Sequence, residues 1–150
     1  MRIRIETGED EEIVIRCREP NEKTYALRAA IEDVMRGENE IRLTSDGREH
    51  FLPKSEILFF ESSEGKVYAH TANEIYTAPY KLFELEDIMS SSFVRISKSV
   101  IVNLLQIRSI RREVVGNGEL TFRNSYKKTY FSRAYYKLLQ YKIEEMRLGK

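Results

Sequence analysis

Apolar and polar residues alternate in two short runs at the start of the chain. The runs are RIRIE at residues 2–6 and EIVIRCRE at residues 12–19, separated by the acidic segment TGEDE. Alternation with a period of two predicts half-buried strands, and the acidic segment predicts a turn. We therefore expect a hairpin with its isoleucines on one face. The single cysteine, Cys17, lies in the second run, where we expect a small buried side chain rather than a reactive thiol.

The pattern changes to a helical period after Pro20. Apolar residues recur at spacings of three and four, at Leu27, Ala30, Ile31, Val34 and Met35. This spacing predicts an amphipathic helix that reaches about Arg36, and Gly37 follows where a C-cap glycine is typical. The hairpin and the helix together make a small β-β-α unit, which we assign to residues 1–45.

From residue 40 onward the chain contains short β-type runs divided by turn signals. These runs are EIRLT, HFLP, ILFFES, KVYAHT, EIYTA, FVRI, SVIV, IRSIRREVV, ELTFR and KKTYF, with a hairpin turn at Asn117 and Gly118. KLFELEDIMSS predicts a short helix, and a final helix is expected from about Ser132. The predicted fold class is mostly β with α (α+β), with a second unit over residues 46–150.

Composition and charge restrict the class of protein. The chain is 41% hydrophobic and 33% charged, has no apolar run of the roughly 20 residues that span a bilayer, and starts without a secretion signal. We therefore expect a cytoplasmic globular protein. The net charge is only +1, but the segment from Ser91 to Lys150 holds 13 Lys and Arg against 4 Asp and Glu. This asymmetry fits either a polyanion-binding face or an ordinary solvated surface.

The sequence contains none of the common motifs of enzyme active sites. His50 and His70 are the only histidines, and neither has a cysteine or second histidine at metal-ligand spacing. The glycines form no phosphate loop, and no serine lies in a nucleophile elbow. The acidic residues at 9–12 match no calcium loop, so they indicate a solvated turn. We expect no enzyme, metal site, cofactor or small-molecule substrate.

Two basic segments are better candidates for binding. In FVRISKSVIVNLLQI, residues 93–107, the polar residues Ser97, Lys98 and Ser99 interrupt a strand, so Lys98 should project from a loop. In YFSRAYY, Ser132 is a plausible N-cap and Arg133 lies in the first helical turn. A first-turn arginine opposes the helix dipole unless an anion or a base edge meets it, although an ion pair with a nearby glutamate would explain it nearly as well.

These segments resemble the LytTR family of bacterial DNA-binding domains. The resemblance runs from about Leu52 to Leu139 and is carried by ILFFESSEGKVYAHT, KLFELEDIM, FVRISKSVIVNLLQI and YFSRAYYKLL. Its most specific positions are Phe93, Arg95, Ser99 and Asn103 and the pair Ser132 and Arg133. The resemblance implies a mostly β domain that contacts successive major grooves through loops, and a transcriptional regulator that binds paired direct repeats as two copies.

The resemblance also implies which residues contact DNA. Base-contacting side chains correspond to positions near Lys66, at Lys98 and at Arg133. Many family members have histidine and arginine where this chain has Ser97 and Lys98, and lysine lacks the planar fork of arginine, so Lys98 should contact DNA without discriminating bases sharply. The full set of candidate DNA-binding residues is Lys66, Arg95, Ser97, Lys98, Ser99, Ser132 and Arg133. For Arg95 a structural ion pair is about equally compatible with the sequence, and Asn103 should hydrogen-bond at a strand end.

Only about fifty residues precede the resemblance, too few for a receiver domain. The chain therefore resembles the stand-alone LytTR regulators, some of which are paired with a small membrane protein that restrains them. Its N-terminal unit could serve dimerisation, contact such an antagonist, or complete the fold. Two other classes stay open: an RNA-binding protein that uses Tyr126, Tyr130, Tyr135 and Tyr136 for stacking, and a protein-interaction module with a basic face.

Overall fold

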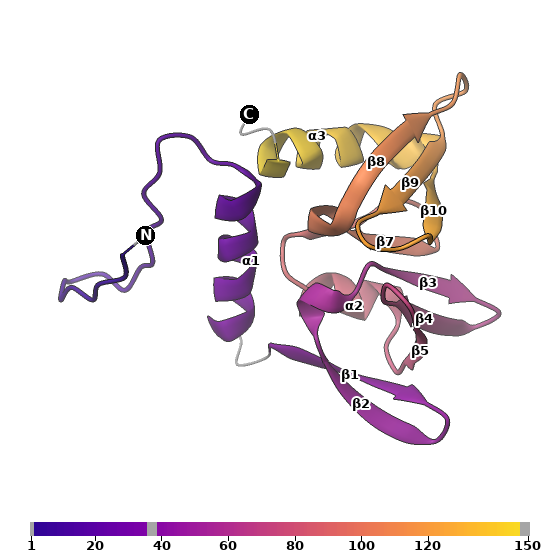
Figure 1. Ribbon diagram of the computed structural model, residues 1–150, viewed down its shortest axis with the longest axis horizontal. Coiled ribbons are helices and arrows are strands. Elements are labelled where there is room, and N and C mark those ends of the chain that lie inside the picture. Colours follow the sequence, from indigo (N-terminus) through magenta and orange to yellow (C-terminus); the bar gives the residue numbers. More distant parts are fainter. Residues whose placement is uncertain (1, 36–38, 148–150) are drawn as a thin grey trace.

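Two antiparallel sheets form the framework of the computed structural model, which describes residues 2–35 and 39–147. The larger sheet has seven strands in the order β2-β1-β5-β4-β3-β7-β6, and the smaller has three in the order β10-β9-β8 (Figure 1). The predicted fold class, mostly β with helices, is confirmed.

The strands follow the predicted runs closely. In the larger sheet they are β1 (Glu40–Ser45), β2 (Arg48–Pro53), β3 (Phe59–Ser63), β4 (Lys66–His70), β5 (Ile75–Ala78), β6 (Phe93–Arg95) and β7 (Val100–Asn103). In the smaller sheet they are β8 (Ile107–Arg112), β9 (Gly118–Phe122) and β10 (Lys128–Phe131). Because β1 pairs with both β2 and β5, the larger sheet begins before residue 46. The division of the chain into two units at that residue stays a prediction.

Two hydrophobic cores lie on opposite faces of strand β3. Successive side chains of a strand point to opposite faces, so the neighbours Phe59 and Phe60 enter different cores. Phe59 stacks on Phe122 with ring centroids 5.3 Å apart, which joins the two sheets and helix α3 (Tyr136–Arg147). Phe60 packs in the core that includes Leu85 of helix α2 (Leu82–Ile88). Packing on both faces fixes β3 in place, and the loop that follows the strand projects from this fixed position.

Helix α1 (Glu22–Met35) forms as predicted but packs by a different face. Val34 and Met35, expected on the apolar side, are 60% and 72% exposed, and Ala29 is the buried residue of the helix. The helix does not fill its site, since a cleft of about 490 Å³ remains beside it. Gly37, the expected C-cap, lies outside the described residues.

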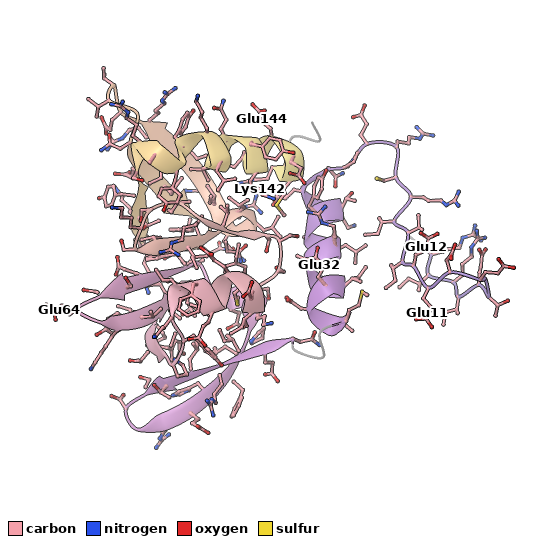
Figure 2. The ribbon with its side chains drawn as sticks, turned by 180° about the vertical axis from the view of Figure 1, so that it is seen from behind. Glu11, Glu12, Glu32, Glu64, Lys142 and Glu144 are labelled. Carbon is pink, nitrogen blue, oxygen red and sulfur yellow. The ribbon has the colours of Figure 1, made fainter. Side chains whose placement is uncertain are left out.

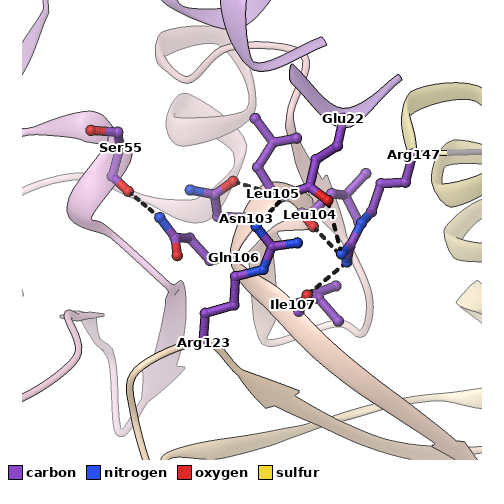
Figure 3. Close-up of polar contacts among 9 residues, drawn as sticks. All are labelled: Glu22, Ser55, Asn103, Leu104, Leu105, Gln106, Ile107, Arg123 and Arg147. Carbon is purple, nitrogen blue, oxygen red and sulfur yellow. Dashed lines mark hydrogen bonds and ion pairs between the residues drawn. The ribbon is translucent and has the colours of Figure 1, made fainter. Parts of the chain in front are cut away.

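Ionic contacts hold α1 where apolar contacts are few. Glu22 forms ion pairs with Arg123 and with Arg147, whose guanidinium also donates to the carbonyl oxygen of Ile107 at 2.7 Å (Figure 3). The hydrogen bond from Arg123 lowers the pKa of the Glu22 carboxyl, with the nearby Arg147 acting in the same direction. Farther along the helix, Glu32 accepts a hydrogen bond from the hydroxyl of Ser91 at 2.9 Å. The helix is therefore attached to the sheets through its acidic residues.

The first segment of the chain differs from the sequence prediction. Residues 2–21 contain no strand, so neither strand of the expected hairpin forms there, and of the three predicted elements only the helix, α1, is present. Cys17, which was predicted to be buried, is exposed. Both differences have one cause, because this segment extends away from the sheets and its side chains find no core to enter (Figure 1). We call residues 2–21 the N-terminal arm.

Candidate nucleic-acid interface

The hairpin between β3 and β4 presents the first candidate residue. Glu64 and Gly65 adopt φ angles of 52° and 78°, which is the left-handed conformation that two-residue hairpin turns require. Lys66 follows the turn as the first residue of β4, and its side chain is exposed. Figure 2 shows Glu64 at the tip of this hairpin, at the opposite end of the molecule from the N-terminal arm. The hairpin therefore carries a cation next to an acidic residue at one end of the molecule.

The connection between β6 and β7 presents the second candidate. Ile96 is fully buried and donates its backbone N–H to the carbonyl oxygen of Val100 at 3.0 Å, which closes a loop of three residues. Within that loop the hydroxyl oxygen of Ser97 accepts a hydrogen bond from the backbone N–H of Ser99 at 3.2 Å. Lys98 lies at the tip and is exposed. The loop is thus fixed on both sides, and Lys98 is the member whose side chain points to solvent.

Arg95 supports this loop from inside the protein. Its Nε donates to the carbonyl oxygen of Ser97 at 3.0 Å, and one of its terminal nitrogens donates to the carbonyl oxygen of Lys98. The other terminal nitrogen pairs with Glu86 of α2 at 2.9 Å. Because its donors are engaged within the protein, Arg95 is placed to hold Lys98 rather than to project beside it.

The turn between β10 and α3 presents the third candidate. A short 3-10 helix, Arg133–Tyr135, precedes α3, and the side chain of Ser132 makes no capping hydrogen bond. The backbone N–H of Ser132 instead donates to the carbonyl oxygen of Ile96 at 2.9 Å. Arg133 is exposed. Ser132 therefore acts through its backbone, by joining the end of β10 to the loop that carries Lys98.

Two backbone hydrogen bonds bring the three cations to one edge. Ser62 donates to the carbonyl oxygen of Ser99 at 2.8 Å, and Ser132 donates to that of Ile96 at 2.9 Å. The edge consequently runs through β4, β3, β7, β6 and β10, across both sheets. Neighbouring strands lie about 4.8 Å apart, so the row from Lys66 to Arg133 is on the order of 20 Å long. We call Lys66, Lys98 and Arg133, with the loops that carry them, the cationic edge.

The β8–β9 hairpin also reaches the cationic edge, which the sequence did not reveal. A methyl group on Gly116 would lie 2.8 Å from Cγ of Arg133, so the turn of this hairpin contacts the Arg133 side chain. Arg112 lies over the ring of Tyr136 at 4.2 Å. Asn117 and Gly118 predicted the turn itself, but a turn signal does not indicate which distant residue the turn will contact.

The tyrosines that could favour RNA binding differ in their exposure and contacts. Tyr136 stacks on Phe131 with ring centroids 5.5 Å apart and is covered by Arg112. Tyr126 and Tyr130 are 102% and 63% exposed, whereas Tyr135 is half-buried.

Asn103 has the strand-end role expected for it. It is buried, its side-chain amide donates to the carbonyl oxygen of Ile57 at 3.0 Å, and its side-chain oxygen accepts from the backbone N–H of Leu105 at 3.2 Å.

Within residues 2–35 and 39–147, no group of three or more His, Cys, Asp or Glu side chains could hold a metal ion. Among the helices of this part of the chain, none has the length and hydropathy needed to cross a membrane.

Comparison with known proteins places these features in a family. Residues 47–144 match the LytTr DNA-binding domain family. An uncharacterized HTH-type transcriptional regulator from Staphylococcus aureus strain NCTC 8325 is 31% identical over 94 residues, and one from strain MRSA252 is 30% identical. The match covers 63% of this chain, and the chain spans 63% of the length of these relatives. Their names refer to a helix-turn-helix, but no two α-helices are consecutive in the described part of this chain.

A solved structure gives the same fold. The LytTr DNA-binding domain of a response regulator from Bacillus cereus superimposes with a TM-score of 0.67 at 23% identity, over 71% of this chain and 98% of that chain. The family match includes β3 to β10 and all three loops of the cationic edge. The chain belongs to the LytTr family of DNA-binding domains.

Proposed function

We propose that this protein regulates transcription by binding duplex DNA through the cationic edge. The observation that carries the proposal is the pair of backbone hydrogen bonds, Ser62 to Ser99 and Ser132 to Ile96, that align three exposed cations on one side of the molecule. Family membership and the regulator names of the relatives support the same function. The ends of the row carry Lys66 and Arg133, and Lys98 lies between them.

The DNA contacts follow from the length and chemistry of the edge. A row on the order of 20 Å exceeds the roughly 12 Å width of one major groove, which supports contacts with successive grooves along one side of the duplex. Arg133 can donate two parallel hydrogen bonds to a guanine, whereas Lys98 acts as a point charge. Arg95, Ser97, Ser99 and Ser132 keep these cations in place. Paired direct repeats, each bound by one copy, are the target arrangement that we propose.

The test is a titration of variants against DNA selected by the native protein from a random duplex library. We expect Arg133→Ala to weaken binding and to relax base preference at one position by about 1–3 kcal/mol. Lys98→Ala should weaken binding to all sequences and lower the slope of log affinity against log salt by about 1. Lys23→Ala is the matched control, because Lys23 is exposed on α1, away from the cationic edge.

Three results would contradict the proposal. Unchanged affinity in both edge variants would remove the cationic edge from the interface. Selected sequences without a repeated motif would exclude the paired arrangement, and preferential binding of single-stranded RNA in a competition would exclude duplex DNA as the target.

A further inference from the structure

The N-terminal arm exposes apolar residues in a β-type pattern without a partner strand. Ile3 and Ile5 are 94% and 96% exposed, and Ile13 and Val14 are 59% and 57% exposed. β-branched residues in an alternating run favour strands, and exposed strands of this kind pair with other chains. Figure 2 shows Glu11 and Glu12 on the arm, at the opposite end of the molecule from Glu64. A partner on the arm would therefore leave the cationic edge accessible.

The second run of the arm is complementary to itself. When residues 10–18 of two copies pair antiparallel about Val14, Glu12 lies opposite Arg16 and Asp10 lies opposite Arg18. Each of these pairs occurs twice, because the contact has twofold symmetry. On the other face of the same ribbon, Ile13 of each copy lies opposite Ile15 of its partner. Opposite charges and β-branched pairs directly across a ladder both stabilise it.

Pairing of the two runs within one chain lacks this complementarity. In the register that places Ile5 against Ile13 and Ile3 against Ile15, Glu6 lies opposite Glu12. The same register places Arg2 opposite Arg16. Like charges directly opposite each other destabilise a ladder. In this register the two runs of one copy therefore oppose each other less favourably than two copies of the second run do.

We propose that residues 10–18 form an antiparallel ribbon with the same segment of a second copy of this chain, so that the protein dimerises through its N-terminal arm. A two-stranded ribbon alone is marginally stable, and the exposed Ile3 and Ile5 of both copies are available to cover its isoleucine face. The contact therefore forms weakly in solution.

Disulfide trapping without DNA tests the register directly. Residues opposite each other across an antiparallel ladder have Cα atoms about 4.5–5.5 Å apart, within the range of a disulfide. Val14→Cys combined with Cys17→Ser should give a covalent dimer under mild oxidation. The native chain is the matched control, because Cys17 would lie opposite Glu11, and the two Cys17 thiols would be about 20 Å apart along the ribbon. No trapping at position 14, or equal trapping through Cys17, would overturn the proposal.

Charge reversal tests the ion pairs independently of any cysteine. Glu12→Arg alone and Arg16→Glu alone should each raise the dimer dissociation constant, measured by sedimentation equilibrium, by about tenfold because two attractive pairs become repulsive. The double variant restores opposite charges and should return the constant to the native value. Failure of the double variant to restore association would overturn the proposed register, even if the single variants behave as expected.

The result is separable from the test of DNA binding. Trapping and sedimentation need no DNA, so a chain that dimerises but does not bind duplex DNA would retain this inference while contradicting the proposed function. Conversely, DNA binding by a chain that remains monomeric at all tested concentrations, with no trapping at position 14, would retain the function and overturn the inference.

Discussion

Arg95 allows a direct test of whether a cation beside the cationic edge contacts DNA or holds the loop that carries Lys98. Its guanidinium bonds the carbonyl oxygens of Ser97 and Lys98 and pairs with Glu86. Lysine keeps the charge at this position but lacks the planar fork that reaches both carbonyls. The variants Arg95→Lys and Arg95→Ala therefore separate charge from geometry.

The expected loss of DNA affinity follows from the cost of ordering the loop that carries Lys98. Without Arg95, the backbone of Ser97 and Lys98 is no longer fixed, and ordering each residue again on binding costs about 1 kcal/mol. The resulting 2 kcal/mol corresponds to about a 30-fold loss of affinity for DNA. Because phosphate contacts are unchanged in this account, the salt dependence should remain that of the native protein. Removal of a phosphate contact would instead lower the slope of log affinity against log salt concentration by about 0.9.

The assay is fluorescence anisotropy with labelled operator DNA at four or more salt concentrations, with circular dichroism to confirm folding. We expect similar losses for Arg95→Lys and Arg95→Ala, both with the native slope. Glu86→Gln removes only a partly exposed ion pair, which contributes less than about 1 kcal/mol, and should bind within fivefold of the native protein. Near-native binding by Arg95→Lys, together with a reduced slope for Arg95→Ala, would contradict the loop-holding role of Arg95 and place its side chain on a phosphate.

Two further predictions concern stability. Gly118→Ala should lower the free energy of unfolding by several kcal/mol, measured by urea denaturation, because the added methyl would collide with the carbonyl oxygen of Arg111 and the ring of Phe131; a cost below about 1 kcal/mol would contradict this packing. His70 stacks on Phe59, and its burial, assisted by Lys127, lowers its pKa to about 4. The unfolded chain takes up this proton near pH 6.5 and the folded chain near pH 4, so stability should fall as pH falls between these values, by about 2 kcal/mol between pH 7 and 5. His70→Gln should lose this part of the pH dependence, and an identical profile for the variant would show that His70 does not contribute it.

The strands could be predicted from sequence because their patterns are local. Short β-type runs identified β3 and β4, and the turn residues between these runs separated the two strands, since left-handed φ angles favour few residue types. The short polar interruption at Lys98 likewise predicted a loop. These features depend on residues close together in the chain, which a single sequence displays directly.

The arrangement of the site depends on contacts between distant residues. The hydrogen bond from Ser132 to Ile96 joins segments 36 residues apart and aligns Arg133 with Lys98. Nothing local to either segment indicates this contact, so the sequence identified both cations as candidates but did not indicate their positions relative to each other. The resemblance to a family supplied the expectation that they act together.

The N-terminal prediction differed from the structure for a related reason. An alternating pattern indicates strand tendency but does not identify the partner strand. Helix α1 shows the same limit, since its apolar spacing pointed to Val34, while Glu22 and Glu32 hold the helix through polar contacts. Ion pairs between distant side chains leave no periodic signal in a sequence.

Hydrogen–deuterium exchange of the native protein with and without operator DNA shows whether the three loops of the cationic edge contact DNA together. If the cationic edge meets DNA as one surface, backbone amides near Lys66, Lys98 and Arg133 should gain protection together, while those in the middle of α1 should not. Protection of only one of these three loops, or protection confined to α1 or to α3, would contradict DNA binding by the cationic edge.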